Sequence, residues 1–488
     1  MSEPGASAPS ELGARAVSNT LFILGARVIS RVVSLVTVLV LANALGATNY
    51  GRYTTLIAYS ALVSVIADIG FAPLYTREAA RNPKQLGDYL GTLMVLKLAL
   101  AGIAVIVLAI ALYSAGGLTE LIVPGAVLMA ATAYANLLRN TFYAVGRAEF
   151  DAIAIIAEIA IQAAFILYGS RTHAPVAFYV WGYTASFTFT ILYSIGVITF
   201  FRLGRIRLGF DAGLIRKWLP WALPFAYTFF LTNLYFRADV PILQHYRPFA
   251  EIGWYQLAYK PFEALQFVPL AIQAVVYPLL GVYFVSDASR LRVAYHRFFK
   301  VLVLLGWPLT VGTFVLVHPI GRAFHLFENS EPSLRILAFG IVFLFANSAF
   351  YAMLNATNRQ GFNAWATGLA AAINIALNLV FIPFYGYLAA SVVTVITEAA
   401  LCTMGWWFVA RGRPDLKLPW LSLSWKVLLA GAIMGAVLLV LGRFSIYLAA
   451  PIGGLVYAGA IYLLKAIDPE EWQLARRGLL SRVRPARA

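Results

Sequence analysis

The chain has 488 residues, of which 61% are apolar and only 12% are charged, and its formal net charge is +16. Its mean hydropathy of +0.78 excludes an ordinary soluble domain, in which roughly a quarter of the residues would be charged. The composition predicts an all-α integral membrane protein that crosses the membrane many times. The single cysteine, Cys402, excludes a disulfide framework within one chain and a thiolate metal cluster.

Apolar stretches of the length of a membrane-spanning helix follow one another along almost the whole chain. Each is close to the ~20 residues that a crossing needs, and each is too long for a barrel strand. The long stretch 253–283 contains three prolines, so we expect it to be kinked or tilted. The 14 predicted spans are 19–43, 52–72, 89–113, 120–142, 150–168, 175–200, 218–243, 253–283, 299–317, 334–354, 362–383, 386–409, 425–441 and 446–465.

The first predicted span contains two arginines, Arg27 and Arg31. Because they are four residues apart, they share one face of a helix, and Arg31 lies near the middle of the span. A cation at that depth costs at least ~2.5–3.5 kcal/mol in lipid, so it must face protein, water or an anionic ligand.

Lysines and arginines gather in alternate loops, for example at 202–217 and 290–300. The positive-inside rule then predicts that both termini are cytoplasmic, and the basic charge indicates topology rather than nucleic-acid binding. All loops are short, and the chain has no Gly-Lys pair and hence no P-loop. We therefore expect no enzyme activity, no catalytic residues, no cofactor and no metal site.

Two sequence patterns recur about two hundred residues apart. Gly-x-Tyr opens the second and the eighth predicted spans, at Gly51 and Gly253, and similar segments, 144–150 and 356–362, follow the fourth and tenth. The repetition predicts an N-lobe at 19–201 and a C-lobe at 218–410, six helices each, joined by a basic linker at 202–217. Two further spans would occupy 425–465. We expect a disordered tail at 1–18, before the N-lobe, and a basic tail at 466–488, after the last span. Repeat-built transporters bind substrate between such lobes.

Several ionisable residues lie inside the predicted spans, where such residues usually serve function. Lys260, followed by the helix-bending Pro261, and Arg31 indicate a cationic, water-filled cavity that suits phosphate or pyrophosphate. Arg27 and Arg237 are further candidates for substrate binding. Four carboxylates are candidates for ion coupling: Glu158, Asp239, Glu263 and Glu398.

Structural interpretations compete with these functional ones. Asp68 could cap a helix or pair with Arg77 or Arg81 at the cytoplasmic interface, and Lys97 could extend toward that interface. Arg237 and Asp239 could form a self-contained pair, whereas Glu263 could pair with Lys260 three residues earlier.

Three segments resemble the polysaccharide flippases of the multidrug/oligosaccharidyl-lipid/polysaccharide exporter superfamily, in its O-antigen and teichoic-acid branch. They are ADIGFAPLYTREAAR (67–81), GWYQLAYK (253–260) and INIALNLVFIPFYGYLAASVVTVITE (373–398). The resemblance covers most of residues 15–410. Asn374, Asn378, Pro383 and Gly386 fit the family pattern, and a second glycine usual near 388–389 is missing.

The resemblance implies two six-helix lobes in a V-shaped, alternating-access arrangement, with two additional C-terminal helices. It implies a flippase of the plasma (inner) membrane that moves a polyprenyl-diphosphate-linked oligosaccharide to the outer leaflet for polysaccharide or lipopolysaccharide biosynthesis. Its partners would be this lipid-linked glycan, membrane lipids, a glycan polymerase and other assembly proteins. Arg31 and Lys260 resemble two arginine positions that line the cavity of related lipid II flippases. At the second of these positions this chain has a lysine in place of the usual arginine.

Three alternatives remain open. Fourteen spans also suit a lipid II flippase, which would carry a related diphosphate lipid. An ion-coupled multidrug exporter would share the fold, although cavities for cationic drugs are expected to be acidic. A membrane-embedded glycan polymerase or ligase would need catalytic groups in a large outside loop. The outside loops of this chain are short, and the only notable cluster in them consists of Arg322, His325, Glu328 and Glu331.

Overall fold

The computed structural model describes residues 9–204, 206–442 and 445–467, with side chains from Val33 onward, and it is helical throughout these ranges, without strands. The chain divides into two compact units. The first holds Met1–Ala264 and Thr367–Val393, and the second holds Leu265–Ala366 and Thr394–Ala488. Residues 1–8 and 468–488, which belong to the two predicted tails, lie outside the described residues.

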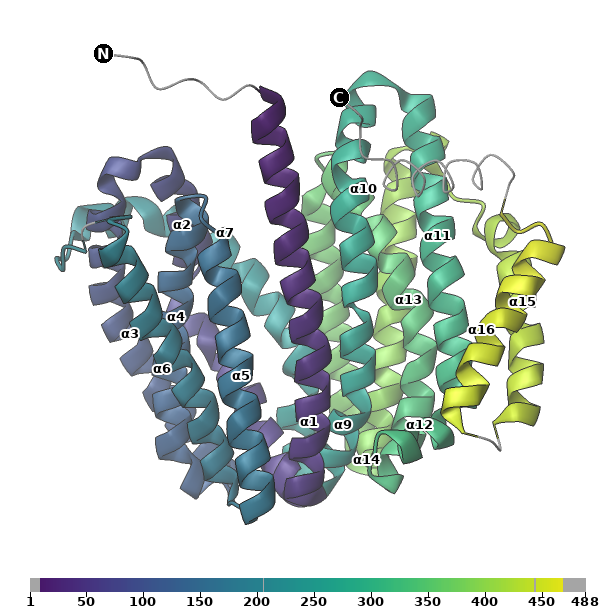
Figure 1. The fold of residues 1–488 in the computed structure, drawn as a ribbon, viewed down its shortest axis with the longest axis horizontal. Helices are drawn as coiled ribbons and strands as arrows, with labels where there is room; N and C mark the ends of the chain where they lie inside the picture. The colour runs from purple at the N-terminus through teal and green to yellow at the C-terminus, as the bar shows by residue number, and fades with distance from the viewer. Residues whose placement is uncertain (1–8, 205, 443–444, 468–488) are drawn as a thin grey trace. The chain divides into compact units, whose positions relative to one another are not determined.

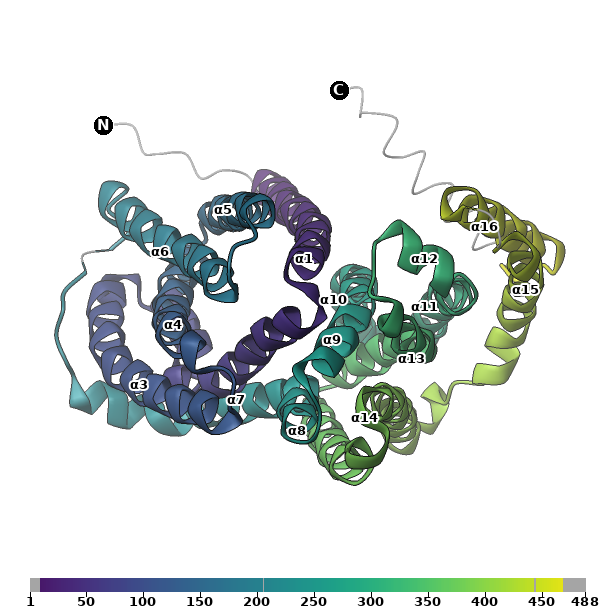
Figure 2. The same ribbon diagram turned by 90° about the horizontal axis from the view of Figure 1, so that it is seen from below.

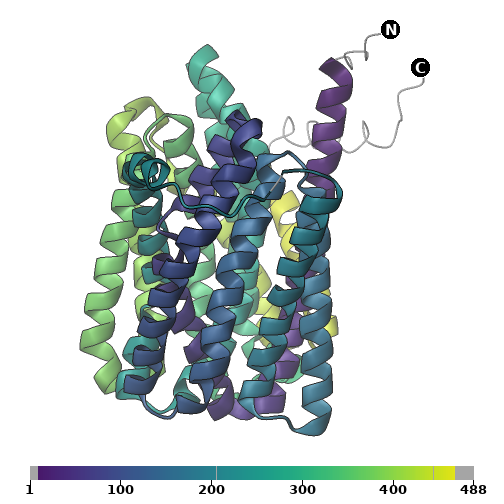
Figure 3. The same ribbon diagram turned by 90° about the vertical axis from the view of Figure 1, so that its left-hand side faces the viewer.

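The first unit contains nine helices of the described chain and the middle of a tenth (Figure 1). Figure 3 shows α3 to α6 running side by side. A buried apolar core, which includes Leu74, Leu90, Phe142 and Trp218, ties α2, α3, α4 and α7 together. The helices are α1 (Pro9–Asp68), α2 (Phe71–Arg81), α3 (Leu86–Ala115), α4 (Ile122–Ala144), α5 (Glu149–Thr172), α6 (Val176–Phe200), α7 (Ala212–Arg237), α8 (Asp239–Tyr246) and α9 (Phe249–Leu265).

The second unit contains the remaining helices of the described chain, with only the two ends of α14. Within it α11 packs against α13 and α15, and α15 packs against α16. The helices are α10 (Phe267–Ser286), α11 (Ala288–Val315), α12 (Val317–Ala323), α13 (Glu331–Ala356), α14 (Gln360–Gly412), α15 (Trp420–Leu441) and α16 (Ile446–Leu463). Short 3₁₀ turns lie at Pro83–Gln85, Thr119–Leu121, Glu328–Ser330 and Pro414–Leu416.

Eleven helical segments among the described residues are long and apolar enough to cross a membrane. The prediction of a multi-pass, all-α membrane protein is confirmed, whereas the count of fourteen spans stays a prediction. The numbers differ because α1 and α14 each run through two predicted spans, and because 218–243, in α7 and α8, falls outside the eleven.

Glycines mark the bends of the two longest helices. In α1 the backbone leaves the helical conformation at Gly46, with φ 70°, so that the helix has two segments (Figure 2). In α14 it does so at Gly386, with φ 59° and ψ −141°. Both conformations favour glycine because other residues would be strained there.

The bend of α14 breaks main-chain hydrogen bonds, and two side chains replace them, one from the turn between α8 and α9 and one from the first turn of α9. The guanidinium of Arg247 donates to the carbonyl oxygens of Ile382 (3.3 Å) and Pro383 (2.9 Å). Glu251 accepts a hydrogen bond from the backbone N–H of Tyr387, at 3.1 Å. This contact, named here the bend clamp, satisfies polar groups that lipid could not satisfy.

The two repeated Gly-x-Tyr motifs lie directly against each other. A Cβ atom on Gly51 would collide with the carbonyl of Phe249, and one on Gly253 would collide with the carbonyl of Ala47. The absence of side chains at both positions lets α9 cross α1 at backbone distance. This crossing determines where the charged residues of α9 lie relative to α1.

Candidate functional site

Three charged side chains converge on a cavity of about 420 Å³ in the first unit. Glu263 accepts from the Lys260 ammonium at 2.8 Å and from the Arg237 guanidinium at 3.3 Å. Each of the three side chains keeps between a fifth and a quarter of its surface exposed. Among the described side chains, two cations around one carboxylate leave one net positive charge, so this space is named the basic cavity.

Local structure explains why the three groups meet. Lys260 and Glu263 are three residues apart on α9, which places them on one face of the helix. Arg237 ends α7, and its long side chain reaches the same carboxylate. The predicted pairing of Lys260 with Glu263 is confirmed. The alternative pairing of Arg237 with Asp239 is wrong, because Arg237 contacts Glu263 whereas Asp239 accepts from Tyr255 at 2.5 Å.

Both segments of α1 line the basic cavity. Ser34, Val38 and Leu41 contribute before the bend, and Tyr50 and Ile57 contribute after it. Polar residues complete the lining from other helices: Gln162 in α5, Tyr183 in α6 and Gln256 in α9.

The positions of Arg27 and Arg31 continue the α1 stripe that lines this cavity. They precede Ser34 by seven and three residues, which is the spacing of one helix face. Their side chains lie outside the described part of the chain, so their roles stay predictions.

Gln256, which is 3% exposed and lines the basic cavity, was not among the residues predicted from the sequence. Helical spacing could have found it, because it lies four residues before Lys260 on the same face.

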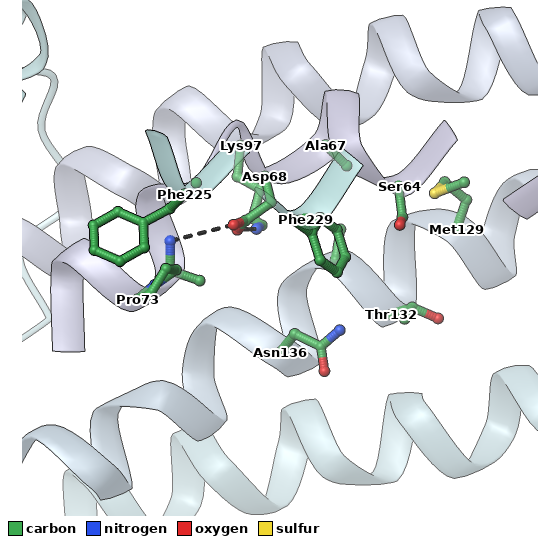
Figure 4. A pocket seen from close by; sticks show the side chains of 13 residues that line it. Ser64, Ala67, Asp68, Pro73, Lys97, Met129, Thr132, Asn136, Phe225 and Phe229 are labelled. Atoms are coloured by element: carbon green, nitrogen blue, oxygen red, sulfur yellow. Dashed lines mark hydrogen bonds and ion pairs between the residues drawn. The ribbon is translucent and has the colours of Figure 1, made fainter. Parts of the chain in front are cut away.

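A second cavity of about 260 Å³ lies beside a buried ion pair in the first unit (Figure 4). Lys97 Nζ and Asp68 Oδ1 are 2.9 Å apart, and Asp68 also accepts from the N–H of Ala72. The two charges cancel, so this space is named the neutral cavity. Its other polar lining residues are Ser64, Thr132 and Asn136.

This ion pair corrects one expectation and confirms another. Asp68 does cap the next helix through Ala72, but its charged partner is Lys97, whereas Arg77 and Arg81 contact Glu78. Lys97 is 5% exposed, so this pair is buried within the protein.

The candidate ion-coupling residue Glu158 belongs to a buried charge cluster that joins α4, α5 and α6. Arg139 contacts Glu158 at 3.2 Å and Asp151 at 2.6 Å. Thr190 donates to Glu158 at 2.6 Å, and Tyr143 donates to Asp151. Arg139 and Asp151 were not predicted from the sequence, because their pairing depends on how α4 packs against α5.

The four candidate ion-coupling carboxylates do not form one site. Asp239 lies beside Tyr255, and Glu263 lies in the basic cavity. Glu398 belongs to the second unit, where Asn347 donates to its carboxylate at 2.8 Å. Among the described residues, no group of three or more His, Cys, Asp or Glu side chains could hold a metal ion. Each carboxylate therefore has to be tested separately.

Two family models match the chain. The model of polysaccharide biosynthesis proteins matches residues 16–284, which is more than half of the chain, and the MatE model matches residues 224–380. No curated protein sequence is significantly similar.

Solved structures with the same fold cover most of the chain. The lipid II flippase MurJ in an inward closed conformation covers 94% of this chain and 100% of its own, with a TM-score of 0.74 and 15% identity. An inward-facing multidrug resistance MATE transporter covers 80% and 96%, with a TM-score of 0.66 and 14% identity. A superfamily transporter from Pyrococcus furiosus, described as having a binding pocket of reversed polarity, covers 81% and 94%, with a TM-score of 0.53 and 14% identity.

These families and structures are those of transporters and flippases, not of enzymes. The all-α membrane fold and the superfamily inferred from the three sequence segments are thus confirmed. This chain belongs to the polysaccharide biosynthesis protein family of the multidrug/oligosaccharidyl-lipid/polysaccharide exporter superfamily.

Proposed function

We propose that this protein is a flippase that moves a polyprenyl-diphosphate-linked oligosaccharide from the cytoplasmic to the outer leaflet, for cell-surface polysaccharide synthesis of the O-antigen or teichoic-acid type. The observation that carries the proposal is the convergence of Arg237 and Lys260 on the basic cavity. A net positive charge inside apolar helices is costly unless an anion compensates it.

The diphosphate binds by taking the place of Glu263. It carries more negative charge than one carboxylate and offers more acceptor oxygens to the two cations. Arg237 presents a planar fork that can hold two oxygens at once, whereas Lys260 acts as a point charge. Arg31 and Arg27, on the α1 stripe, extend the binding site for the phosphates toward the cytoplasmic end.

The basic cavity is lined from both predicted repeats, by residues of 34–183 and of 237–264. Alternating access of the two lobes, 19–201 and 218–410, would carry the bound head group across the membrane. The cycle would draw on an ion gradient, the membrane potential or removal of the product downstream, and Glu158, Asp239, Glu263 and Glu398 are the candidates for coupling to an ion. The protein works in the plasma (inner) membrane with both termini in the cytoplasm, beside a glycan polymerase and other assembly proteins.

Two alternatives keep the fold and change the cargo. A lipid II flippase would use the same diphosphate chemistry, and the MurJ structure covers nearly the whole chain. An ion-coupled exporter of cationic drugs is disfavoured, because Arg237 and Lys260 outnumber Glu263 in the basic cavity.

The test uses the full chain reconstituted in liposomes with a fluorescent polyprenyl-diphosphate disaccharide. Membrane-impermeant reductant measures how much probe reaches the outer leaflet. We expect Arg237→Ala and Lys260→Ala to abolish probe movement at unchanged protein abundance. Arg147→Ala is the matched control, because Arg147 forms an exposed pair with Glu149 away from both cavities. Normal movement in both cavity variants would contradict the proposal, and faster movement of lipid II would favour the first alternative.

A further inference from the structure

The neutral cavity and the basic cavity follow one another along the same two helices. On α1, Ile57 lines the basic cavity and Ser64 lines the neutral cavity. Seven residues separate them, so they share one helix face about 10 Å apart. On α7, Arg237 and Phe229 line the two cavities, eight residues or about 12 Å apart.

Close packing brings α7 against this part of α1. Gly70, with φ 74°, follows α1, and a Cβ atom there would collide with the backbone of Ala222 and Ala226 in α7. The two helices pack against each other and both line this wall of the two cavities within the first unit. A ligand anchored in the basic cavity can extend along this wall into the neutral cavity.

Charge distinguishes the two spaces. The described side chains of the basic cavity include two cations and one carboxylate, whereas Asp68 and Lys97 cancel each other in the neutral cavity. A second phosphate would gain little beside the Asp68–Lys97 pair. An uncharged polar group fits the neutral cavity better.

The lining of the neutral cavity has the chemistry that binds hydroxyl groups (Figure 4). Asn136 is exposed to the cavity, and its amide can both donate and accept. The hydroxyls of Thr132 and Ser64 donate to their own helices, to Leu128 and Ala61, and keep lone pairs as acceptors.

Two aromatic rings supply the apolar part of the lining. Phe225 and Phe229 are 38% and 43% exposed, and both come from α7, the helix that ends at Arg237. The flat faces of these rings can pack against the C–H faces of a pyranose. The amide of Asn136 and the hydroxyls of Thr132 and Ser64 can bind the hydroxyl groups at the edge of the same sugar.

We propose that the neutral cavity is a saccharide subsite, which receives the first sugars of a glycan whose diphosphate is held in the basic cavity. This inference rests on the proposed function and adds Asn136, Thr132 and Ser64 as residues that determine sugar specificity.

Binding of two probes to the full chain in detergent tests the subsite. The probes are farnesyl diphosphate and the same molecule carrying a disaccharide of glucose, galactose or N-acetylglucosamine. Wild-type protein should bind at least one glycosylated probe roughly fivefold to tenfold more tightly, as one or two hydrogen bonds would give. Thr132→Val or Asn136→Ala should remove this preference and leave binding of farnesyl diphosphate unchanged.

Thr188→Val is the matched control. Like Thr132, Thr188 donates its hydroxyl to the carbonyl four residues earlier in its helix, but it lines neither cavity. The control should keep the full preference for the glycosylated probe. Equal affinity of wild type for both probes, or equal loss in Thr188→Val, would overturn the subsite.

A separate measurement distinguishes failure of the subsite from failure of the proposed function. If neither diphosphate probe binds, the proposed function fails, and saturation-transfer NMR with the free disaccharides tests the subsite alone. Transfer to a disaccharide that disappears in Asn136→Ala supports the subsite. Absent transfer, or transfer that Asn136→Ala leaves unchanged, overturns it.

Discussion

Replacing Glu263 by glutamine removes the carboxylate that contacts both Lys260 and Arg237 in the basic cavity. The contacts are 2.8 and 3.3 Å long, and the groups are three-quarters or more buried. At an effective dielectric constant of ~20, each pair has a gross attraction of about 5–6 kcal/mol. The carboxylate regains water when it is displaced, so the net worth of such a contact is about 1.5–3 kcal/mol. A diphosphate would no longer have to displace Glu263.

We therefore expect Glu263→Gln to bind farnesyl diphosphate about tenfold to a hundredfold more tightly than wild type. Transport should slow, because tighter binding delays release. Isothermal titration with the detergent-solubilised protein measures the affinity, and the gain should shrink at high salt. Glu149→Gln is the control, since Glu149 pairs with Arg147 on the surface. Unchanged or weaker binding by Glu263→Gln would refute competition between the carboxylate and the substrate.

Three further substitutions test other parts of the argument. Lys260→Arg should retain transport and bind diphosphate at least as well as wild type, because arginine offers two donors to one phosphate; loss equal to Lys260→Ala in the liposome assay would contradict this. Arg139→Ala should lower the free energy of unfolding by about 3–5 kcal/mol, because it leaves the buried carboxylates of Asp151 and Glu158 without their cation. Adding Glu158→Gln should recover part of the lost stability, and thermal unfolding measures both changes. Gly253→Ala should lower the unfolding temperature through its collision with α1, whereas Gly281→Ala, which meets open space, should not.

The charged contacts show what sequence alone could predict. Lys260 and Glu263 lie on one helix, three residues apart, so their pairing followed from helical geometry. Arg237 ends α7 and Asp239 begins α8, so the geometry of a single helix does not decide whether they pair. Asp68 and Lys97 lie on different helices, and their contact depends on packing that no local pattern encodes.

Helix ends could be predicted where the sequence stops being apolar. The predicted spans 19–43 and 52–72 lie on either side of Gly46, and 362–383 and 386–409 divide beside Gly386, but no loop separates the two halves of α1 or of α14, because a single glycine changes the direction of each helix. A bend of one residue leaves no polar loop in the sequence. The repeated glycines at 51 and 253 were visible as a sequence pattern. Only the structure shows that Gly51 lies against the backbone of Phe249 and Gly253 against the backbone of Ala47.

The bend clamp has a kinetic consequence. Arg247 and Glu251 hold main-chain groups of α14 that have no helical partner at the bend. Pulling the start of α9 away from this bend would leave two carbonyls and one N–H unsatisfied, and each costs several kcal/mol where water is absent. Rearrangements that keep this contact are therefore fast compared with any that break it. A step that separates the two segments would proceed only as quickly as water or another donor reaches Ile382 and Pro383.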